Sequence, residues 1–165
     1  MLEDPYVQRN GFHVPRATLV LGAGEAANAA TSIWMGGAHS LRGDEWVPEE
    51  LRSAWVIDCA GEIDASYRST AGRWLACVFP DIDGPLSGSN RAHLVVEQAL
   101  EAIRSGTAPE RIYVMCQHGM NRSGLLTGLL LRALGIGPRE SVERIRLARP
   151  GALANDAFRL MVLAE

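Results

Sequence analysis

The chain has 165 residues, 47% of them hydrophobic, and a formal net charge of −3 at pH 7. This length suits one domain with a hydrophobic core, and the slightly acidic balance with scattered arginines disfavours a long nucleic acid or an anionic membrane as partner. No apolar run reaches the roughly 20 residues that span a bilayer, and the N-terminus lacks the pattern of a signal peptide, so we expect a cytoplasmic protein.

The basic residues and the cysteines narrow the class of protein further. No lysine occurs, and alanine and glycine are abundant, which indicates GC-rich codon usage and a bacterial source. Cys59, Cys77 and Cys116 are widely spaced without a CxxC pair, so neither a disulfide framework nor a structural zinc site is predicted. The isolated histidines complete no metal-ligand spacing, and we expect no metal and no cofactor.

In chain order, residues 1–16 are polar and contain two prolines, which predicts a flexible N-terminal arm before a single domain at 17–165. "TLVLGAGEAA" then resembles a strand followed by the GxGxxA dinucleotide fingerprint. Fewer than ten residues separate it from the next predicted strand, too few for the crossover helix that a dinucleotide site requires. We therefore predict a turn there.

Regular elements follow from the spacing of apolar residues. Short runs rich in β-branched and aromatic residues predict strands at 32–37, 54–59, 74–79 and 111–116. Helical spacing, with glycine or proline at the ends, predicts helices at 90–106, 124–135, 138–150 and 156–163. Since strands come early and helices gather late, we expect an α/β domain with a central, mostly parallel sheet flanked by helices.

The stretch "CQHGMNRSG" lies between the last strand and an apolar helix. Gly119 gives the backbone the freedom to curl, so that several amide N–H groups converge on one point. The dipole of the following helix and a bidentate grip by Arg122 would then hold a tetrahedral dianion. This pattern predicts a phosphate-binding loop.

The same positive field favours the ionised sulfur of Cys116, which is then a nucleophile toward phosphorus. The hydroxyl of Ser123 can hydrogen-bond that sulfur and help it leave when the intermediate is hydrolysed. The competing interpretation is a cysteine that only packs at the end of a strand.

These residues resemble the signature of the protein tyrosine phosphatase superfamily, cysteine, five residues and arginine, in its dual-specificity phosphatase-like branch. "IWMGG" and "RIRLARPGALANDAF" are also similar to the opening strand and closing helices of such domains, so the resemblance covers residues 32–163. It implies that fold and hydrolysis of phosphate monoesters, phosphotyrosine or phosphoserine/threonine in proteins, through a phosphocysteine. The loop residues expected to bind substrate are Gln117, His118, Gly119, Met120, Asn121 and Arg122.

A general acid would ease departure of the alcohol, typically by about 10²–10⁴-fold. The turn-rich segment "FPDIDGPLSGSN" carries two candidates. In the family that the chain resembles, the acid precedes the cysteine by roughly thirty residues and a proline follows it closely, which favours Asp83. Asp81 is the alternative, and both could also be ordinary turn aspartates.

Two features depart from the family pattern or add to it. Met115 stands where the family usually has a histidine, which leaves the degree of activation of Cys116 open. Cys59 ends a strand predicted to lie beside the strand of Cys116. The resemblance implies a reversible disulfide between these cysteines under oxidation, and a packed core cysteine is the favoured alternative.

Three other functions stay open. The loop is similar to that of the RNA 5′-triphosphatase domains of capping enzymes, so an RNA or nucleotide 5′-phosphate is an alternative substrate, which the acidic charge disfavours. Phosphoinositides are disfavoured because the loop interior holds only Arg122 and His118 as basic groups. The third is a non-catalytic phosphate-binding module.

Overall fold

The computed structural model describes residues 6–9, 12–15, 17–27, 30–37, 52–61, 68, 71–82 and 89–164. Its main sheet has five strands in the order β3-β4-β7-β5-β6. Their bounds are Thr18–Leu21 for β3, Ser32–Gly37 for β4, Arg111–Cys116 for β7, Ala54–Asp58 for β5 and Arg73–Ala76 for β6.

The strands β4, β7, β5 and β6 run parallel, and only the edge strand β3 is antiparallel to its neighbour β4. The predicted mostly parallel sheet is therefore confirmed. The antiparallel pairing is possible because β3 and β4 are joined by a short connection whose turn is closed by a hydrogen bond from the Glu25 N–H to the Gly22 carbonyl, at 3.2 Å. The turn predicted in place of a dinucleotide fingerprint is confirmed.

Within the predicted N-terminal arm, strands β1 (Tyr6–Arg9) and β2 (Phe12–Pro15) pair with each other as an antiparallel hairpin. They form a sheet of their own and do not extend the five-stranded one. The division into an arm and a single domain beginning at residue 17 stays a prediction.

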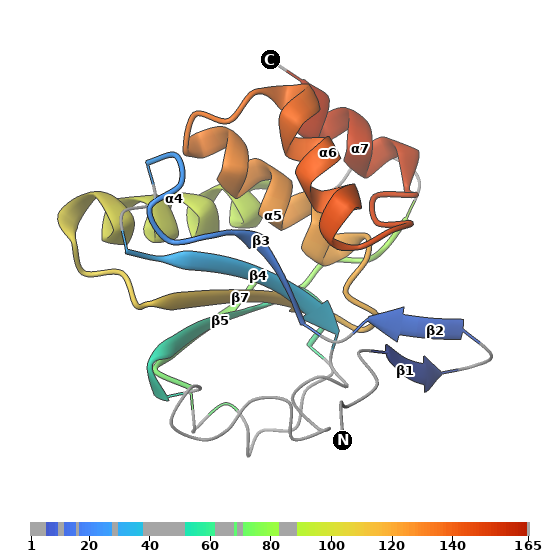
Figure 1. Ribbon diagram of the computed structural model, residues 1–165, viewed down its shortest axis with the longest axis horizontal. Helices are drawn as coiled ribbons and strands as arrows, with labels where there is room; N and C mark the ends of the chain where they lie inside the picture. Colours follow the sequence, from blue (N-terminus) through green and yellow to red (C-terminus); the bar gives the residue numbers. More distant parts are fainter. Residues whose placement is uncertain are drawn as a thin grey trace.

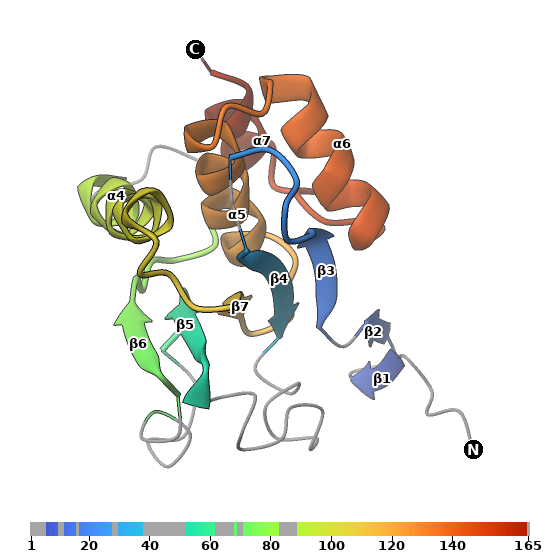
Figure 2. The same cartoon turned by 60° about the vertical axis from the view of Figure 1, so that its left-hand side comes forward.

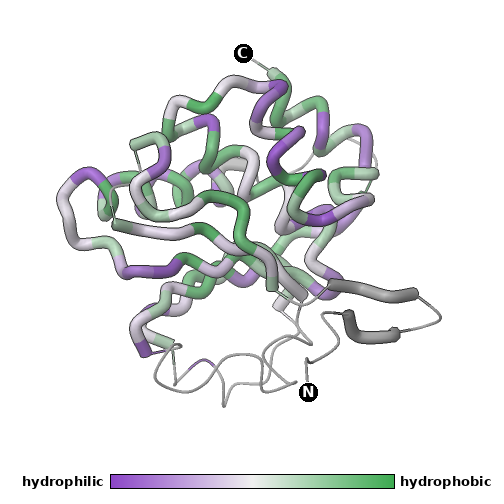
Figure 3. Tube along the Cα trace, viewed as in Figure 1, coloured by the Kyte–Doolittle hydropathy of each residue, from purple (hydrophilic) through white to green (hydrophobic). Residues whose placement is uncertain are grey.

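The described helices cover one face of the sheet, as Figures 1 and 2 show. Hydrophilic residues recur along the outer helices in Figure 3, as expected when each helix buries a single face. Most of α5, by contrast, is buried between the sheet and the other helices. The bounds are Ser89–Ser105 for α4, Arg122–Ala133 for α5, Pro138–Ala148 for α6 and Asp156–Leu163 for α7.

The central strands are buried on both sides, which explains why they read as continuous apolar runs. Residues such as Ile57 and Val114 face the helices and belong to the main core. A second, smaller apolar cluster lies on the opposite face of the sheet and consists of Ala54, Val56, Tyr113 and Met115, packed against Trp34 and Trp74.

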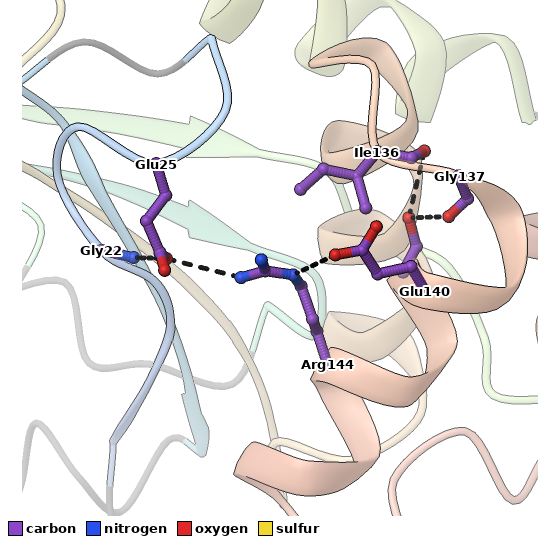
Figure 4. A network of polar contacts seen from close by, with 7 residues as sticks. Gly22, Glu25, Ile136, Gly137, Glu140 and Arg144 are labelled. Atoms are coloured by element: carbon purple, nitrogen blue, oxygen red, sulfur yellow. Dashed lines mark hydrogen bonds and ion pairs between the residues drawn. The ribbon is translucent and has the colours of Figure 1, made fainter.

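Helix α6 is tied to the connection between β3 and β4 by a polar network on the surface (Figure 4). Arg144 lies 3.4 Å from Glu25 Oε2 and 3.2 Å from Glu140 Oε1, and Glu25 in turn accepts the N–H of Gly22 at 2.7 Å. Exposed ion pairs of this kind contribute about 0–1 kcal/mol each. The network therefore orients α6 more than it stabilises it.

Candidate active site

The turn at residues 117–121 joins β7 to α5, so the predicted nucleophile and the predicted anion ligand lie at its two ends. Gly119 in the middle has a φ of +71°, a conformation that strains any residue with a side chain. A Cβ on Gly119 would also stand 2.3 Å from the carbonyl carbon of Gly36 on β4. The turn therefore lies directly against the neighbouring strand, and only glycine fits at its centre.

The sulfur of Cys116 lies inside this turn. Cys116 is the last residue of β7 and is 3% exposed. The N–H of Gly119 donates to Sγ at 3.2 Å, and the hydroxyl of the buried Ser123, in the first turn of α5, lies 3.3 Å from Sγ. An amide and a hydroxyl at these distances support negative charge on the sulfur, because both can donate hydrogen bonds to it.

The first turn of α5 lies at the same place, since it carries Ser123. The helix begins at Arg122, which is partly buried, and its N-cap residue Asn121 makes no side-chain hydrogen bond that caps the helix. A helix N-terminus carries partial positive charge, which attracts an anion bound in front of it. The first turn of the helix and the loop therefore lie together around the sulfur, and their role as one anion-binding position stays a prediction.

Instead of capping α5, the side chain of Asn121 joins three segments of the chain. Its Nδ2 donates to Asp81 Oδ2 at 3.1 Å, and its Oδ1 accepts the N–H of Asn155 at 3.1 Å. Asn155 Nδ2 donates to the second carboxylate oxygen of Asp81 at 2.8 Å. We call this arrangement the Asp81–Asn121–Asn155 ring. It holds the segment after β6 and the segment before α7 beside the loop.

Asp81 and Asp83 are the two aspartates predicted as general acids. Asp81 lies in the ring, next to the loop residue that precedes Arg122. Asp83 follows two positions later on the same segment and lies outside the described residues. The structure brings one carboxylate of this segment to the loop, and the role of Asp83 stays a prediction.

The other predicted substrate ligands share the loop. Gln117, His118 and Met120 are each partly exposed in the turn. The carbonyl of Met120 accepts the N–H of Leu153 at 3.2 Å, which ties the loop to the segment between α6 and α7. All residues predicted as substrate ligands thus lie between the end of β7 and the first residue of α5.

Two residues that contact the loop had no role assigned from the sequence. Arg149, the C-cap residue of α6, is 0% exposed and donates from Nε to the carbonyl of Gly119 at 2.6 Å. Asn155 caps α7 by accepting the Phe158 N–H at 3.2 Å and also belongs to the ring. Both lie in "RIRLARPGALANDAF", whose likeness to closing helices was visible, but no local pattern shows which carbonyl or carboxylate a distant side chain will reach.

The three cysteines form a row at the carboxyl ends of β7, β5 and β6. The N–H of Cys59 donates to the carbonyl of Met115 at 2.8 Å, and the N–H of Cys77 donates to the carbonyl of Asp58 at 2.8 Å, so both strand pairings continue to the cysteines. All three are buried, free thiols in the main core. The predicted neighbourhood of Cys59 and Cys116 is confirmed, whereas a disulfide between them stays a prediction.

Burial keeps two of these thiols neutral. It raises the pKa of the Cys59 thiol well above its ordinary value; Cys77, Cys116 and Asp58 raise it further, and the nearby positive charge of Arg122 lowers it. Burial also raises the pKa of Cys77 to about 11, against a smaller lowering by Arg91. Cys59 and Cys77 are therefore poor nucleophiles at neutral pH, since only the thiolate is reactive.

Met115, which stands at the position of the usual histidine, has its side chain in the small cluster with Val56 and Tyr113, on the face of the sheet opposite Cys116. It is 0% exposed. A thioether donates no hydrogen bond, so this position cannot fix the loop through an N–H group. The order of the loop has to come from other contacts.

Within the described ranges, no group of three His, Cys, Asp or Glu side chains is arranged to hold a metal ion. Across the same part of the chain, the helices are too short or too polar to cross a membrane.

Comparison with known proteins agrees with this arrangement. No protein-family model matches the chain. A protein of Invertebrate iridescent virus 3 named as a tyrosine phosphatase is 28% identical over 107 residues, and the match covers 60% of this chain but only 44% of the viral protein. The chain thus spans less than half of that relative.

Solved structures match over most of their length. The active form of Tk-PTP superposes with a TM-score of 0.63 at 20% identity, covering 90% of this chain and 94% of Tk-PTP. Human DUSP28 gives a TM-score of 0.64 at 17% identity, covering 90% of each chain. PTPMT1 in complex with PI(5)P gives 0.58 at 20% identity, covering 81% of this chain and 88% of PTPMT1. With its mostly parallel sheet and a loop between β7 and α5 that surrounds a cysteine, this chain has the fold of the dual-specificity and tyrosine phosphatases.

Proposed function

We propose that this chain is a cysteine-dependent phosphatase that hydrolyses phosphate monoesters, namely phosphotyrosine and phosphoserine/threonine in proteins, through a phosphocysteine intermediate. The observation that carries the proposal is the contact of Cys116 Sγ with the Gly119 N–H at 3.2 Å and with Ser123 Oγ at 3.3 Å, in front of the N-terminus of α5. Groups that support charge on a sulfur and also attract an oxyanion suit attack on a phosphoryl group.

In the first step, the Cys116 thiolate attacks phosphorus. The S–P bond forms, the bond from phosphorus to the ester oxygen breaks, and Asp83 gives its proton to the departing oxygen. Arg122 holds two phosphoryl oxygens with its planar guanidinium, and the amides of residues 117–121 surround the third. Charge that develops on these oxygens is thereby stabilised.

In the second step, the carboxylate of Asp83 takes a proton from a water molecule, whose oxygen attacks phosphorus. The S–P bond breaks, inorganic phosphate leaves, and the sulfur returns as a thiolate. The hydroxyl of Ser123 stabilises that thiolate as it departs. The site then holds the same groups as before the reaction, with Asp83 protonated again.

The Asp81–Asn121–Asn155 ring supports the choice of Asp83 over Asp81. Both carboxylate oxygens of Asp81 accept amide hydrogen bonds. A general acid has to carry a proton on one oxygen and turn it toward the leaving group, which would break a bond of the ring. In this proposal Asp81 holds residues 81–82, which directly precede Asp83 in the sequence, beside the loop.

The acid is tested with phenyl phosphate, whose leaving group needs protonation. We expect Asp83→Asn to lower kcat/KM by about 10²–10⁴-fold, and Asp81→Asn to lower it far less. With p-nitrophenyl phosphate, whose leaving group is good, both losses should shrink. The reverse ranking of the two variants with phenyl phosphate would give the role of the acid to Asp81.

Other substrates would use the same groups. The likeness of the loop to RNA 5′-triphosphatase domains favours an RNA or nucleotide 5′-phosphate, and a lipid phosphate is a candidate because PTPMT1, which shares the fold, was solved with PI(5)P. Met115 in place of the usual histidine favours a binding module without turnover.

On composition alone, we further propose a bacterial, cytoplasmic protein.

The experiment that tests the function is hydrolysis of p-nitrophenyl phosphate under reducing conditions by the wild type and by Cys116→Ser. We expect turnover by the wild type and none by the variant. A preserved rate in Cys116→Ser would exclude the mechanism. An inactive wild type that still binds phosphate would instead favour the non-catalytic phosphate-binding module. A panel of phosphopeptides, 5′-triphosphorylated RNA and phosphoinositides then ranks the substrates by kcat/KM.

A further inference from the structure

Arg149 stands out because its charge is fully buried. It is 0% exposed and belongs to the largest buried side chains of the described protein. Burying a guanidinium is expensive unless hydrogen bonds replace its water, so an arginine in this position is retained only where its donors are used. The oxygens that these donors reach therefore indicate what the residue is for.

Two of those oxygens belong to the phosphate-binding loop. Arg149 Nε donates to the carbonyl of Gly119 at 2.6 Å, and Nη2 donates to the carbonyl of His118 at 3.2 Å. Nη1 reaches outside the loop, to Thr18 Oγ1 at 3.2 Å and to the carbonyl of Met35 at 3.4 Å. One guanidinium thus fixes two consecutive loop carbonyls relative to the strands β3 and β4.

The carbonyl of His118 and the N–H of Gly119 are parts of one planar peptide group. In a trans peptide these two groups point in opposite directions. The carbonyl is held by Arg149, while the N–H donates to Cys116 Sγ at 3.2 Å. A positive charge on the oxygen side of the peptide also polarises it, which strengthens the hydrogen bond that its N–H donates.

We propose that Arg149 is a positioning residue that aims the His118–Gly119 peptide at the sulfur of Cys116 and thereby favours its ionised form. The inference rests on the proposed function of Cys116 as a nucleophile. It also gives a physical reason why this chain can have Met115 at the preceding position. The loop is ordered by a side chain from the end of α6, so the residue before the cysteine is free to pack in the small apolar cluster.

The test compares Arg149→Lys and Arg149→Met with the wild type. A lysine keeps the positive charge but cannot donate in a fork to two carbonyls, and a methionine keeps bulk without either property. The readout is the rate at which iodoacetamide alkylates Cys116, measured from pH 5 to pH 9 by mass spectrometry. We expect the half-maximal pH to rise by about one unit in Arg149→Lys, which means about tenfold slower alkylation at low pH and an equal rate at high pH.

The control variant is Arg144→Lys, on the same helix but in the surface network with Glu25 and Glu140. It should leave the pH profile unchanged. A purely structural role for Arg149 would reduce the melting temperature of its variants and leave the midpoint of alkylation where it was, and that result would overturn the proposal.

If neither Arg149 variant folds, Thr18→Ala tests the proposal instead. It removes one oxygen that accepts a hydrogen bond from the guanidinium and leaves the arginine in place. We expect a smaller upward shift of the midpoint in the same direction; an unchanged profile would count against the proposal. Alkylation does not require turnover. If the wild type hydrolyses no phosphate ester but the variants still shift the midpoint of alkylation, the proposed function is refuted and the role of Arg149 stands.

Discussion

At the scale of single residues, the candidate site is defined by what surrounds one sulfur. Cys116 Sγ is contacted by an amide N–H at 3.2 Å and a hydroxyl at 3.3 Å, whereas the thiols of Cys59 and Cys77 in the same row have their pKa raised by burial. Three residues of one chemical type therefore have different surroundings within one row. Two predictions follow this contrast.

The first concerns Ser123. A hydrogen bond to a charged group contributes about 1.5–3 kcal/mol, so we expect Ser123→Ala to lower kcat by about 10–100-fold through slower breakdown of the phosphocysteine. The intermediate should accumulate, and stopped-flow traces with p-nitrophenyl phosphate should show a burst of product. Ser141→Ala is the control, because this serine lies in α6 and its hydroxyl donates to the carbonyl of the N-cap residue Gly137. Equal losses in kcat and kcat/KM without a burst would contradict this role.

The second concerns stability at high pH. Burial raises the pKa of Cys77 from 9.0 to about 11, so between these values the folded protein keeps a proton that the unfolded chain has lost. Stability should therefore be fully present below pH 9 and fall toward pH 11, by up to about 3 kcal/mol from this residue. Urea unfolding of the reduced protein at several pH values measures it. Cys77→Ala should flatten the fall, and an identical slope in both proteins would be evidence against the assignment.

At the scale of elements, α5 contacts the sheet on one side and α6 and α7 on the other, and it needs small residues to do so. A Cβ on Gly128 would stand 2.5 Å from Val162 Cγ2 on α7. Of the glycines in "GLLTGLLLRALG", Gly124 and Gly128 are therefore positions of close packing, whereas Gly135 follows the end of the helix. The close contact keeps α7, whose N-cap is Asn155, at a fixed distance from the loop.

Gly128→Ala tests this packing. Alanine gains about 1 kcal/mol in helix propensity, but inserting a methyl into a packed interface costs about 1–3 kcal/mol. We expect a net loss of stability in urea unfolding, recovered in the double variant with Val162→Ala. A Gly128→Ala protein that is more stable than the wild type would show that α7 can move away.

At the scale of the whole molecule, segments far apart in sequence meet at the carboxyl ends of the parallel strands. The Asp81–Asn121–Asn155 ring joins the chain after β6, the loop before α5 and the start of α7. Parallel strands bring their carboxyl ends to one edge, which is where α/β proteins bind ligands. The ring therefore couples the stability of α7 to the geometry of the loop.

Substitutions of Asn155 separate the stability of α7 from the geometry of the loop. Asn155→Ala removes both the N-cap to Phe158 and the bond to Asp81, and loss of a cap costs about 0.5–2 kcal/mol. Asn155→Ser can still cap the helix but is too short to reach Asp81. We expect the serine variant to keep the wild-type melting temperature and to lose kcat/KM with phenyl phosphate. If the two variants lose activity and stability in parallel, the ring has no catalytic role of its own.

Much of this architecture could be predicted from local patterns, because burial on both faces leaves its mark on each strand and amphipathic spacing on each helix. The bounds of β4, β7 and α7 agree with the apolar runs, and Gly119 was recognisable from its place in the loop. The contacts of Arg149 and Asn155 were not predictable, because they span 30 or more positions and depend on how the elements pack. Nor could the sequence reveal that Cys77 completes the row with Cys59.

The close approach of Gly119 to Gly36 has a consequence for how such a protein can change. At this contact main chain rests on main chain, with no side chain at either position that could be shortened to make room. Laboratory evolution toward a bulkier ester should therefore accumulate its substitutions at partly exposed positions of the loop, such as His118 and Met120, while these two glycines stay invariant.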